Sequence, residues 1–163
     1  MKLIGKFLHA KLLLVIYFSL SLDVYAKTIH VSYVIDGDTI VYKEKQDFKK
    51  VRLSCIDAPE IKQPYGLESK LALKELIGGK TVEIAVSNID KYGREIANIT
   101  YQNQDINLRM VSSGNAWVYE AFCRDQPFYT AQMYSKSHKI GLWATINQVA
   151  PWVFRREQHG INK

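Results

Sequence analysis

A series of short, strand-like segments between residues 27 and 101 constrains the fold most strongly. Apolar runs with period-2 character, bounded by turn residues, are typical of β-strands. The pattern predicts five strands, namely KTIHVSYVI (27–35), DTIVYK (38–43), VRLSCI (51–56), KTVEIAV (80–86) and REIANITY (94–101). An Asp-Gly pair separates the first two strands, as in a hairpin turn. The charged stretch KEKQDFKK (43–50) is expected to form an exposed hairpin tip.

Three segments change to a helical period. In YGLESKLALKELIGG (65–79) the apolar residues recur at helical spacing, and Gly78-Gly79 is typical of a helix C-terminus. Two further helical patterns cover about residues 105–113 and 127–140, each followed directly by a glycine. Five short strands with one helix inserted after the third fit a small closed barrel. The sequence therefore predicts an α+β fold, a five-stranded OB-type barrel with three packed helices.

The first 26 residues have the three parts of a secretory signal peptide. Three lysines precede the apolar run LLLVIYFSLSL (12–22), and Val24 and Ala26 occupy the −3 and −1 positions of a cleavage site. The alternative is a membrane anchor, but the run is too short to cross about 30 Å of hydrocarbon as a helix. We expect cleavage after Ala26, export to the periplasm or the medium, and one mature domain of residues 27–163 without membrane attachment.

Charge and cysteine content indicate the kind of partner and the redox state of the mature chain. The whole chain has a formal net charge of +6, and its first 26 residues hold three Lys and one Asp, so residues 27–163 carry +4. A mild basic excess favours polyanionic partners. In an oxidising compartment, Cys55 and Cys123 are expected to form a disulfide, the alternative being two buried free thiols. No sequence signal indicates an oligomer, and we expect a monomer.

Aspartates cluster in the stretch IDGDT (35–39). Asp36 and Gly37 are explained by a hairpin turn, but Asp38 begins the next predicted strand, where Asp is disfavoured. Asp38 is therefore a candidate site residue.

The stretch RLSCIDAPE (52–60) places two more acids at the end of a strand. Pro59 ends the strand and separates Asp57 from Glu60. Two Asp carboxylates with a backbone carbonyl and waters would suit Ca²⁺ or Mg²⁺ rather than Zn²⁺. A Glu just outside such a metal site could act as general base on a water. The alternative is that Glu60 is an exposed acid without a role.

Two arginines complete the candidate chemistry. Arg52 lies in the same strand as Asp57, and simple alternation would turn the two side chains to opposite faces, so a bend or bulge is required. Arg94 follows a Gly turn in DKYGRE (90–95), where a solvated charge is the alternative. Carboxylates, arginines and a basic chain together form the set that phosphoryl chemistry needs.

These three stretches, in this order and at these distances, resemble the staphylococcal nuclease (thermonuclease) family. The resemblance covers about residues 29–143 and extends to GNAWVYEAF (114–122) and HKIGLW (138–143). It implies a five-stranded OB barrel with three helices, and hydrolysis of DNA and RNA that leaves 3′-phosphate ends. It further implies one bound Ca²⁺, with Mg²⁺ as the alternative, held by Asp38, Asp57 and the backbone carbonyl of Ala58. Glu60 matches the general base that activates the attacking water.

The resemblance also assigns residues that bind the substrate. Arg52 and Arg94 match the arginines that bind the phosphate and stabilise the transition state, and Lys91 and Tyr92 match a pair that contacts the nucleotide's phosphate. The tyrosines that flank the base in the best-known member are not clearly matched. Trp117 and Tyr119 are instead the candidates for base stacking, with core packing as the alternative. The segment that follows Glu60 is shorter than in that member, and Ala58 replaces a Thr.

Two alternatives to a Ca²⁺- or Mg²⁺-dependent nuclease fit the residues less well. A catalytically inactive nucleic-acid-binding barrel would have lost some of the matched residues, and all five are present (Asp38, Arg52, Asp57, Glu60 and Arg94). A zinc or His-metal nuclease would need paired histidines, whereas those of the mature chain are scattered. The sequence thus predicts an exported, metal-dependent nuclease with little base specificity.

Overall fold

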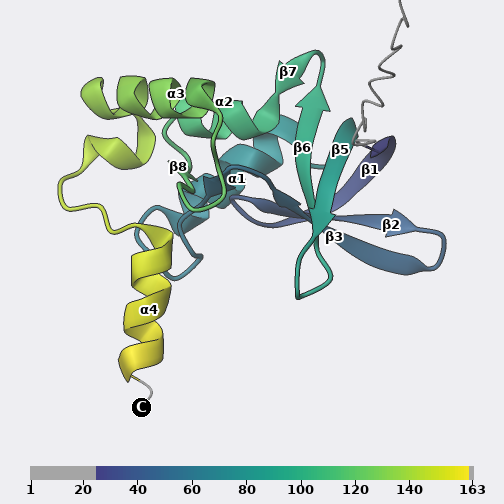
Figure 1. Ribbon diagram of the computed structural model, residues 1–163, viewed down its shortest axis with the longest axis horizontal. Coiled ribbons are helices and arrows are strands. Elements are labelled where there is room, and N and C mark those ends of the chain that lie inside the picture. The colour runs from purple at the N-terminus through teal and green to yellow at the C-terminus, as the bar shows by residue number, and fades with distance from the viewer. Residues whose placement is uncertain (1–24, 162–163) are drawn as a thin grey trace, which may run out of the picture.

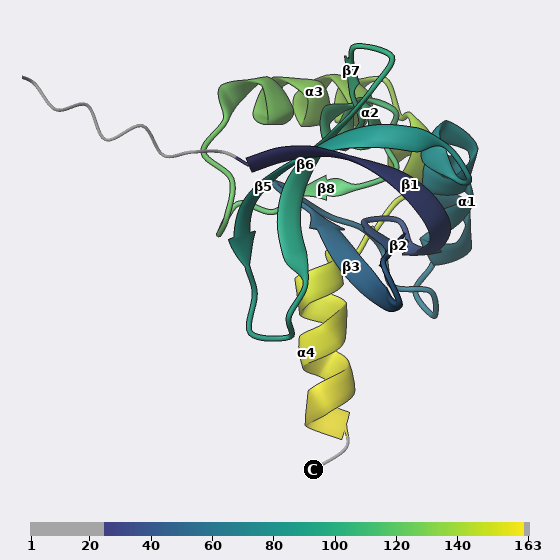
Figure 2. The same ribbon diagram turned by 90° about the vertical axis from the view of Figure 1, so that its right-hand side faces the viewer.

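The computed structural model describes residues 25–161 of the chain. Five strands form a closed barrel (Figures 1 and 2): β1 (Tyr25–Asp36), β2 (Thr39–Glu44), β3 (Asp47–Leu53), β5 (Thr81–Ile89) and β6 (Glu95–Tyr101). Their order is β3-β2-β1-β5-β6 with antiparallel neighbours, and a parallel pairing of β3 with β6 closes the ring. The predicted signal peptide lies almost wholly outside the described residues. Within them, no helix is long and apolar enough to cross a membrane.

Three short strands lie outside this barrel ring. β7 (Gln104–Asp105) pairs with the end of β6, while β4 (Ile56–Asp57) and β8 (Trp117–Val118) form a separate two-stranded sheet. The predicted strand 51–56 is thus divided between β3 and β4. The stretch 43–50 is the exposed end of a hairpin, as expected, but β2 and β3 continue almost to a tight turn at Lys45, whose φ is 56°. The charged residues of this stretch lie on exposed strand ends.

Between residues 25 and 161, four α-helices and one 3₁₀-helix accompany the barrel. They are α1 (Gly66–Ile77), α2 (Ile106–Ser112), α3 (Gln126–Ser137), η1 (Gly141–Ala144) and α4 (Pro151–Ile161). The first three confirm the predicted helices, and α4 is an addition that the sequence pattern did not predict. α1 buries Leu73 and Ile77 in the core, whereas Leu67 and Leu71 are exposed. In Figures 1 and 2, α4 extends away from the rest of the molecule.

The predicted helix-ending glycines bring two turns into contact. Gly114, after α2, has φ 65°, and Gly141, at the start of η1, has φ 60°. A Cβ on Gly114 would lie 2.1 Å from the carbonyl oxygen of Ile140, so no larger residue fits. The amide of Leu142 donates to the Gly114 carbonyl at 2.8 Å. This contact fixes the segment that leads from α2 into β8 and the candidate site.

Candidate active site

Asp38 lies where the turn between β1 and β2 meets the segment after β4. Its Oδ2 accepts a hydrogen bond from the amide of Ala58 at 2.6 Å, and its Oδ1 accepts one from the Thr39 hydroxyl at 3.0 Å. The amide of Asp38 donates to Asp36 Oδ1 at 3.0 Å. The Asp38 side chain is 7% exposed. This carboxylate is therefore fixed in a buried position next to Ala58.

Gly37 permits this close approach of the two segments. A Cβ at this position would lie 1.8 Å from Ser69 Oγ on α1 and 2.7 Å from the Cβ of Ala58. Both distances are shorter than any real van der Waals contact, and the backbone there is not left-handed. Gly37 is required because of packing.

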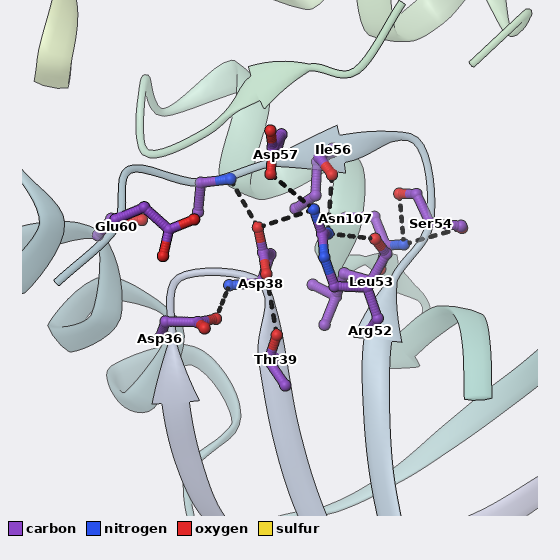
Figure 3. Close-up of polar contacts among 12 residues, drawn as sticks. Asp36, Asp38, Thr39, Arg52, Leu53, Ser54, Ile56, Asp57, Glu60 and Asn107 are labelled. Atoms are coloured by element: carbon purple, nitrogen blue, oxygen red, sulfur yellow. Dashed lines mark hydrogen bonds and ion pairs between the residues drawn. The ribbon is translucent and has the colours of Figure 1, made fainter. Parts of the chain in front are cut away.

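A left-handed residue places Arg52 and Asp57 on the same side. β3 ends at Leu53, Cys55 has φ 65°, and the short β4 begins at Ile56. Arg52 Nη2 donates to Asp57 Oδ1 at 2.8 Å and lies 3.2 Å from Asp38 Oδ2 (Figure 3). Its Nη1 donates to the carbonyls of Leu53 and Ile56 at 2.9 and 2.8 Å. The bend that simple alternation required is present.

A disulfide holds this bend. Cys55 is bonded to Cys123, with the two Cα atoms 4.5 Å apart. The carbonyl of Cys55 also accepts a hydrogen bond from the amide of Tyr119 at 2.8 Å. The turn that orients Asp57 is thus tied covalently to the segment before α3.

Arg155 on α4 reaches the same carboxylates. Its Nη2 lies 2.8 Å from Asp57 Oδ2, and its Nη1 lies 3.2 Å from Asp57 Oδ1 and 2.7 Å from Glu60 Oε1. The Glu60 and Arg155 side chains are 38% and 37% exposed, against 2% for Asp57. The cluster is therefore buried at Asp57 and open to solvent at Glu60.

The charges in this cluster influence one another. Burial raises the pKa of the Asp57 carboxyl, and the hydrogen bonds from Arg155 oppose that effect. Burial and the neighbouring Asp38 raise the pKa of Asp36 to about 7. Burial alone would lower the pKa of Arg155, but its hydrogen bonds to Asp57 and Glu60 outweigh burial and raise it. Arg155 is thus firmly cationic at neutral pH.

Comparisons with known proteins place this geometry in a family. Residues 50–145, more than half of the chain, match the family described as "Staphylococcal nuclease homologue". The chain belongs to the staphylococcal nuclease family. A Haemophilus influenzae protein named "Uncharacterized endonuclease" is 40% identical over 132 residues, which cover 80% of this chain and 74% of that protein. An Escherichia coli O157:H7 protein with the same name is 37% identical over 126 residues, or 77% of this chain and 82% of that protein.

A plant relative is similar over a smaller part of its length. The "Probable staphylococcal-like nuclease CAN3" of Oryza sativa subsp. japonica is 40% identical over 114 residues. These residues cover 70% of this chain but only 30% of the rice protein. The likeness therefore concerns the nuclease-like portion of a much longer protein.

Four of the five residues that the family resemblance singled out converge in the structure. Figure 3 shows Asp38, Arg52, Asp57 and Glu60 gathered where β2 begins and β4 ends. The fifth, Arg94, has no described contact with these four. It lies two residues before Ile96, which is the register partner of Arg52 across the parallel β3–β6 pairing. Arg94 therefore directly precedes the strand that pairs with the Arg52 strand.

The turn between β5 and β6 carries the predicted phosphate-contacting pair. Tyr92 is 72% exposed, and Lys91 Nζ lies 5.0 Å from the centre of its ring. Asp90 fixes the turn, because its Oδ1 accepts from the amides of Tyr92 and Arg94 at 2.9 and 3.0 Å. Its Oδ2 accepts from Arg94 Nε at 2.8 Å. The structure places Lys91 and Tyr92 in solvent at the tip of this turn.

The two predicted stacking aromatics belong to a larger aromatic group. The ring of Trp117 is 4.4 Å from that of Trp143 and 5.7 Å from that of Trp152, both in edge-on contact. Tyr119 stacks on Trp152 at 5.5 Å and an interplanar angle of 13°. Trp117 is thus engaged in packing, whereas Tyr119 lines a surface cavity beside Arg155.

The sequence did not predict the contacts of Arg155 with Asp57 and Glu60. The residue lies in PWVFRRE (151–157), outside the three motifs and 98 residues after Asp57. Its only sequence signal is an Arg pair beside an aromatic residue in a basic C-terminal segment, which does not indicate a partner.

Proposed function

We propose that this chain is an exported, Ca²⁺-dependent nuclease that hydrolyses phosphodiester bonds of DNA, and also of RNA, with little sequence specificity. The observation that carries the proposal is the convergence of Asp38, Asp57, Arg52 and Glu60 in one cluster. The chain's membership of the staphylococcal nuclease family, and relatives named as endonucleases, support it.

The donor set fits a hard divalent cation. Within residues 25–161, no three His, Cys, Asp or Glu side chains gather as a ready metal site, so side chains alone would not saturate an ion. Ca²⁺ and Mg²⁺ accept backbone carbonyls and water beside carboxylates. Asp38 and Asp57, which already sit against two guanidinium groups, would supply the charge, and the Ala58 carbonyl a neutral oxygen. Bound there, the cation would polarise the phosphate and lower the pKa of a water.

The protein's own groups would supply the remaining chemistry. Glu60 is the cluster's solvent-accessible carboxylate, so it is suited to accept the proton of a water that attacks the phosphorus. Arg52, held by the Leu53 and Ile56 carbonyls, presents a fixed guanidinium to the developing negative charge. Arg94, directly before β6, would add a second. Backbone contacts of this kind position a strand without reading its sequence.

The proposal of export to the periplasm or the medium rests on the signal-like segment 1–26 and is supported by the disulfide. Disulfides persist in oxidising compartments and are rare in reducing ones. The Cys55–Cys123 bond therefore favours a protein that works outside the cytoplasm.

Digestion of single- and double-stranded DNA and of RNA by the purified protein tests this function. Reactions would contain Ca²⁺, Mg²⁺ or excess chelator, and E60Q would be compared with E68Q, which changes an exposed acid on α1. We expect cation-dependent cutting that E60Q lowers by about 10² to 10⁴ and E68Q leaves unchanged. Near-normal cutting by E60Q would refute its role as base. Nucleic-acid binding without cutting under any cation would instead support an inactive binding module.

A further inference from the structure

Arg155 occupies both oxygens of Asp57. Nη2 pairs with Oδ2 at 2.8 Å, and Nη1 lies 3.2 Å from Oδ1 while it also pairs with Glu60 Oε1 at 2.7 Å. Arg52 Nη2 also donates a hydrogen bond to Asp57 Oδ1, at 2.8 Å. A guanidinium thus stands at each oxygen of the carboxylate that would bind a cation. One oxygen of the proposed general base is engaged as well.

A divalent cation and Arg155 would compete for this position. A cation at Asp57 would need the carboxylate oxygens that the two guanidinium groups already hold. A divalent cation and two guanidinium groups at one carboxylate would also repel one another, so one arginine is expected to leave. Arg52 is the buried, backbone-held arginine, and Arg155 is the more exposed one.

The position of α4 would allow Arg155 to leave the carboxylates. Its first turn is anchored by Trp152, which stacks on Tyr119, while the rest of the helix extends away from the barrel (Figure 2). The Arg155 side chain crosses from this anchored turn to the carboxylates. It also lines a cavity of about 540 Å³ with Tyr119 and Trp152. A released Arg155 therefore has an open, aromatic-walled space beside the cluster.

We propose that Arg155 is an exchangeable phosphate-binding residue, which pairs with Asp57 and Glu60 in the cation-free chain and moves to a substrate phosphate when a divalent cation takes Asp57. This inference rests on the proposed function and deepens it. The arginine fork matches carboxylate and phosphate oxygens equally well, so one side chain can serve both partners. Its departure also frees the Glu60 oxygen to accept a proton.

Calcium titration by calorimetry, without DNA, tests the release. We expect R155Q to bind Ca²⁺ roughly tenfold more tightly than the wild type, because the competing cation is gone. R155K keeps the charge and is expected to stay within a few-fold of the wild type. R156Q is the matched control, since it removes the same charge from the next, exposed position of α4, and its affinity should stay within about twofold. Unchanged or weaker Ca²⁺ binding by R155Q would overturn the proposal, and a purely structural Arg155 predicts that result.

Cleavage kinetics at saturating Ca²⁺ test the capture of the phosphate. For a single-stranded oligonucleotide we expect R155Q to raise KM about tenfold, with a smaller change in kcat and a smaller KM effect in R156Q. An unchanged KM in R155Q would also overturn the proposal.

The two proposals fail in distinguishable ways. A wild type that binds Ca²⁺ and cuts DNA supports the nuclease function whatever R155Q does. If R155Q then behaves like the wild type, only the proposed exchange of Arg155 is refuted. A wild type that neither binds Ca²⁺ nor cuts under any cation would refute both.

Discussion

Arg52 and Asp57 form a buried ion pair of 2.8 Å across a bend of the chain only five residues long. A straight strand would place these side chains on opposite faces. The left-handed backbone of Cys55 ends β3 and redirects the chain into β4, so the pair exists because of the turn. Arg52 also approaches Asp38, so the same guanidinium holds together the two carboxylates proposed as cation ligands.

Replacing Arg52 by Met should destabilise the cation-free protein strongly. The substitution leaves Asp57 with Arg155 alone and Asp38 without a positive neighbour, in a site where both carboxylates are buried. Removing one partner of a buried ion pair typically costs about 3–5 kcal/mol. Urea unfolding in excess chelator would measure the loss.

Calcium should restore part of the stability that R52M loses. A cation that binds the folded state alone stabilises it by mass action, and here it would also neutralise Asp38 and Asp57. K50M is the matched control, because Lys50 is an exposed cation on the same strand. Equal losses in R52M and K50M, or a deficit that Ca²⁺ does not change, would contradict the assigned role of Arg52.

Local features of the fold and the site could be predicted from the sequence. The alternation of apolar residues in 27–101 predicted the five strands. The acids and arginines of three short stretches predicted Asp38, Arg52, Asp57 and Glu60 as site residues. The strand prediction is confirmed because strand periodicity is a property of neighbouring residues. The four side chains also lie together in the structure, while their roles stay predictions. The splitting of 51–56 into two strands depends on the left-handed Cys55, which no propensity indicates, since such a conformation is rare for a residue other than Gly.

Contacts between distant segments could not be predicted in the same way. Arg155 joins the cluster through a helix 95 residues after Glu60, and an Arg in a basic segment is compatible with many partners. Leu67 and Leu71 recur at helical spacing, yet α1 turns them outward and buries Ser69 and Leu73. Which stripe of a helix faces the core depends on the elements that pack on it, here β1 and the turn at Gly37.

Replacing Gly37 by Ala should disturb both stability and the cation site. The new Cβ would meet Ser69 Oγ at 1.8 Å and Ala58 Cβ at 2.7 Å, so α1 or the Ala58 segment must move. Overpacking of this kind costs about 1–3 kcal/mol, and the shift should weaken Ca²⁺ binding because Ala58 and Asp38 separate. Urea unfolding and calorimetry would measure the two effects. G160A, whose Cβ meets nothing within 4 Å, should show neither, and a G37A protein that matches it would refute the packing argument.

The Cys55–Cys123 disulfide should contribute substantially to stability. It links residues 68 positions apart, and closing a loop of that length stabilises the folded state by about 4 kcal/mol in the chain-entropy model. The double variant C55S/C123S should therefore unfold at a lower urea concentration. Adding reductant should lower the wild-type midpoint to that of the variant and leave the variant unchanged. A wild-type midpoint insensitive to complete reduction would contradict the prediction.

Replacing Asp90 by Asn should release Arg94 and reveal its contribution to substrate binding. Burial raises the pKa of Asp90, but the hydrogen bonds from the Arg94 amide and side chain and from the Tyr92 amide together outweigh burial and lower the pKa. Because the pKa of Asp90 is lower in the folded protein than in the unfolded chain, the ionised carboxylate stabilises the folded protein at pH values above its ordinary pKa. This stabilisation is lost as the pH falls through the lowered pKa. D90N should thus be less stable than the wild type at pH 7, by a small amount because the pair is near the surface, and this difference should disappear as the pH falls through the lowered pKa.

The kinetic effect of D90N separates two roles for the β5–β6 turn. If Asp90 only shapes an exposed loop, KM and kcat for DNA should both stay near wild-type values. We expect KM to rise several-fold, because Arg94 loses the Nε contact of 2.8 Å that fixes its direction beside the strand carrying Arg52. Steady-state kinetics at saturating Ca²⁺ would measure this, with R94Q as the reference for complete loss of the guanidinium. Because D90N removes only the orientation of Arg94 and R94Q removes its charge as well, the defect of D90N should be the smaller of the two. A D90N defect larger than that of R94Q would show that Asp90 acts through Lys91 or Tyr92 instead.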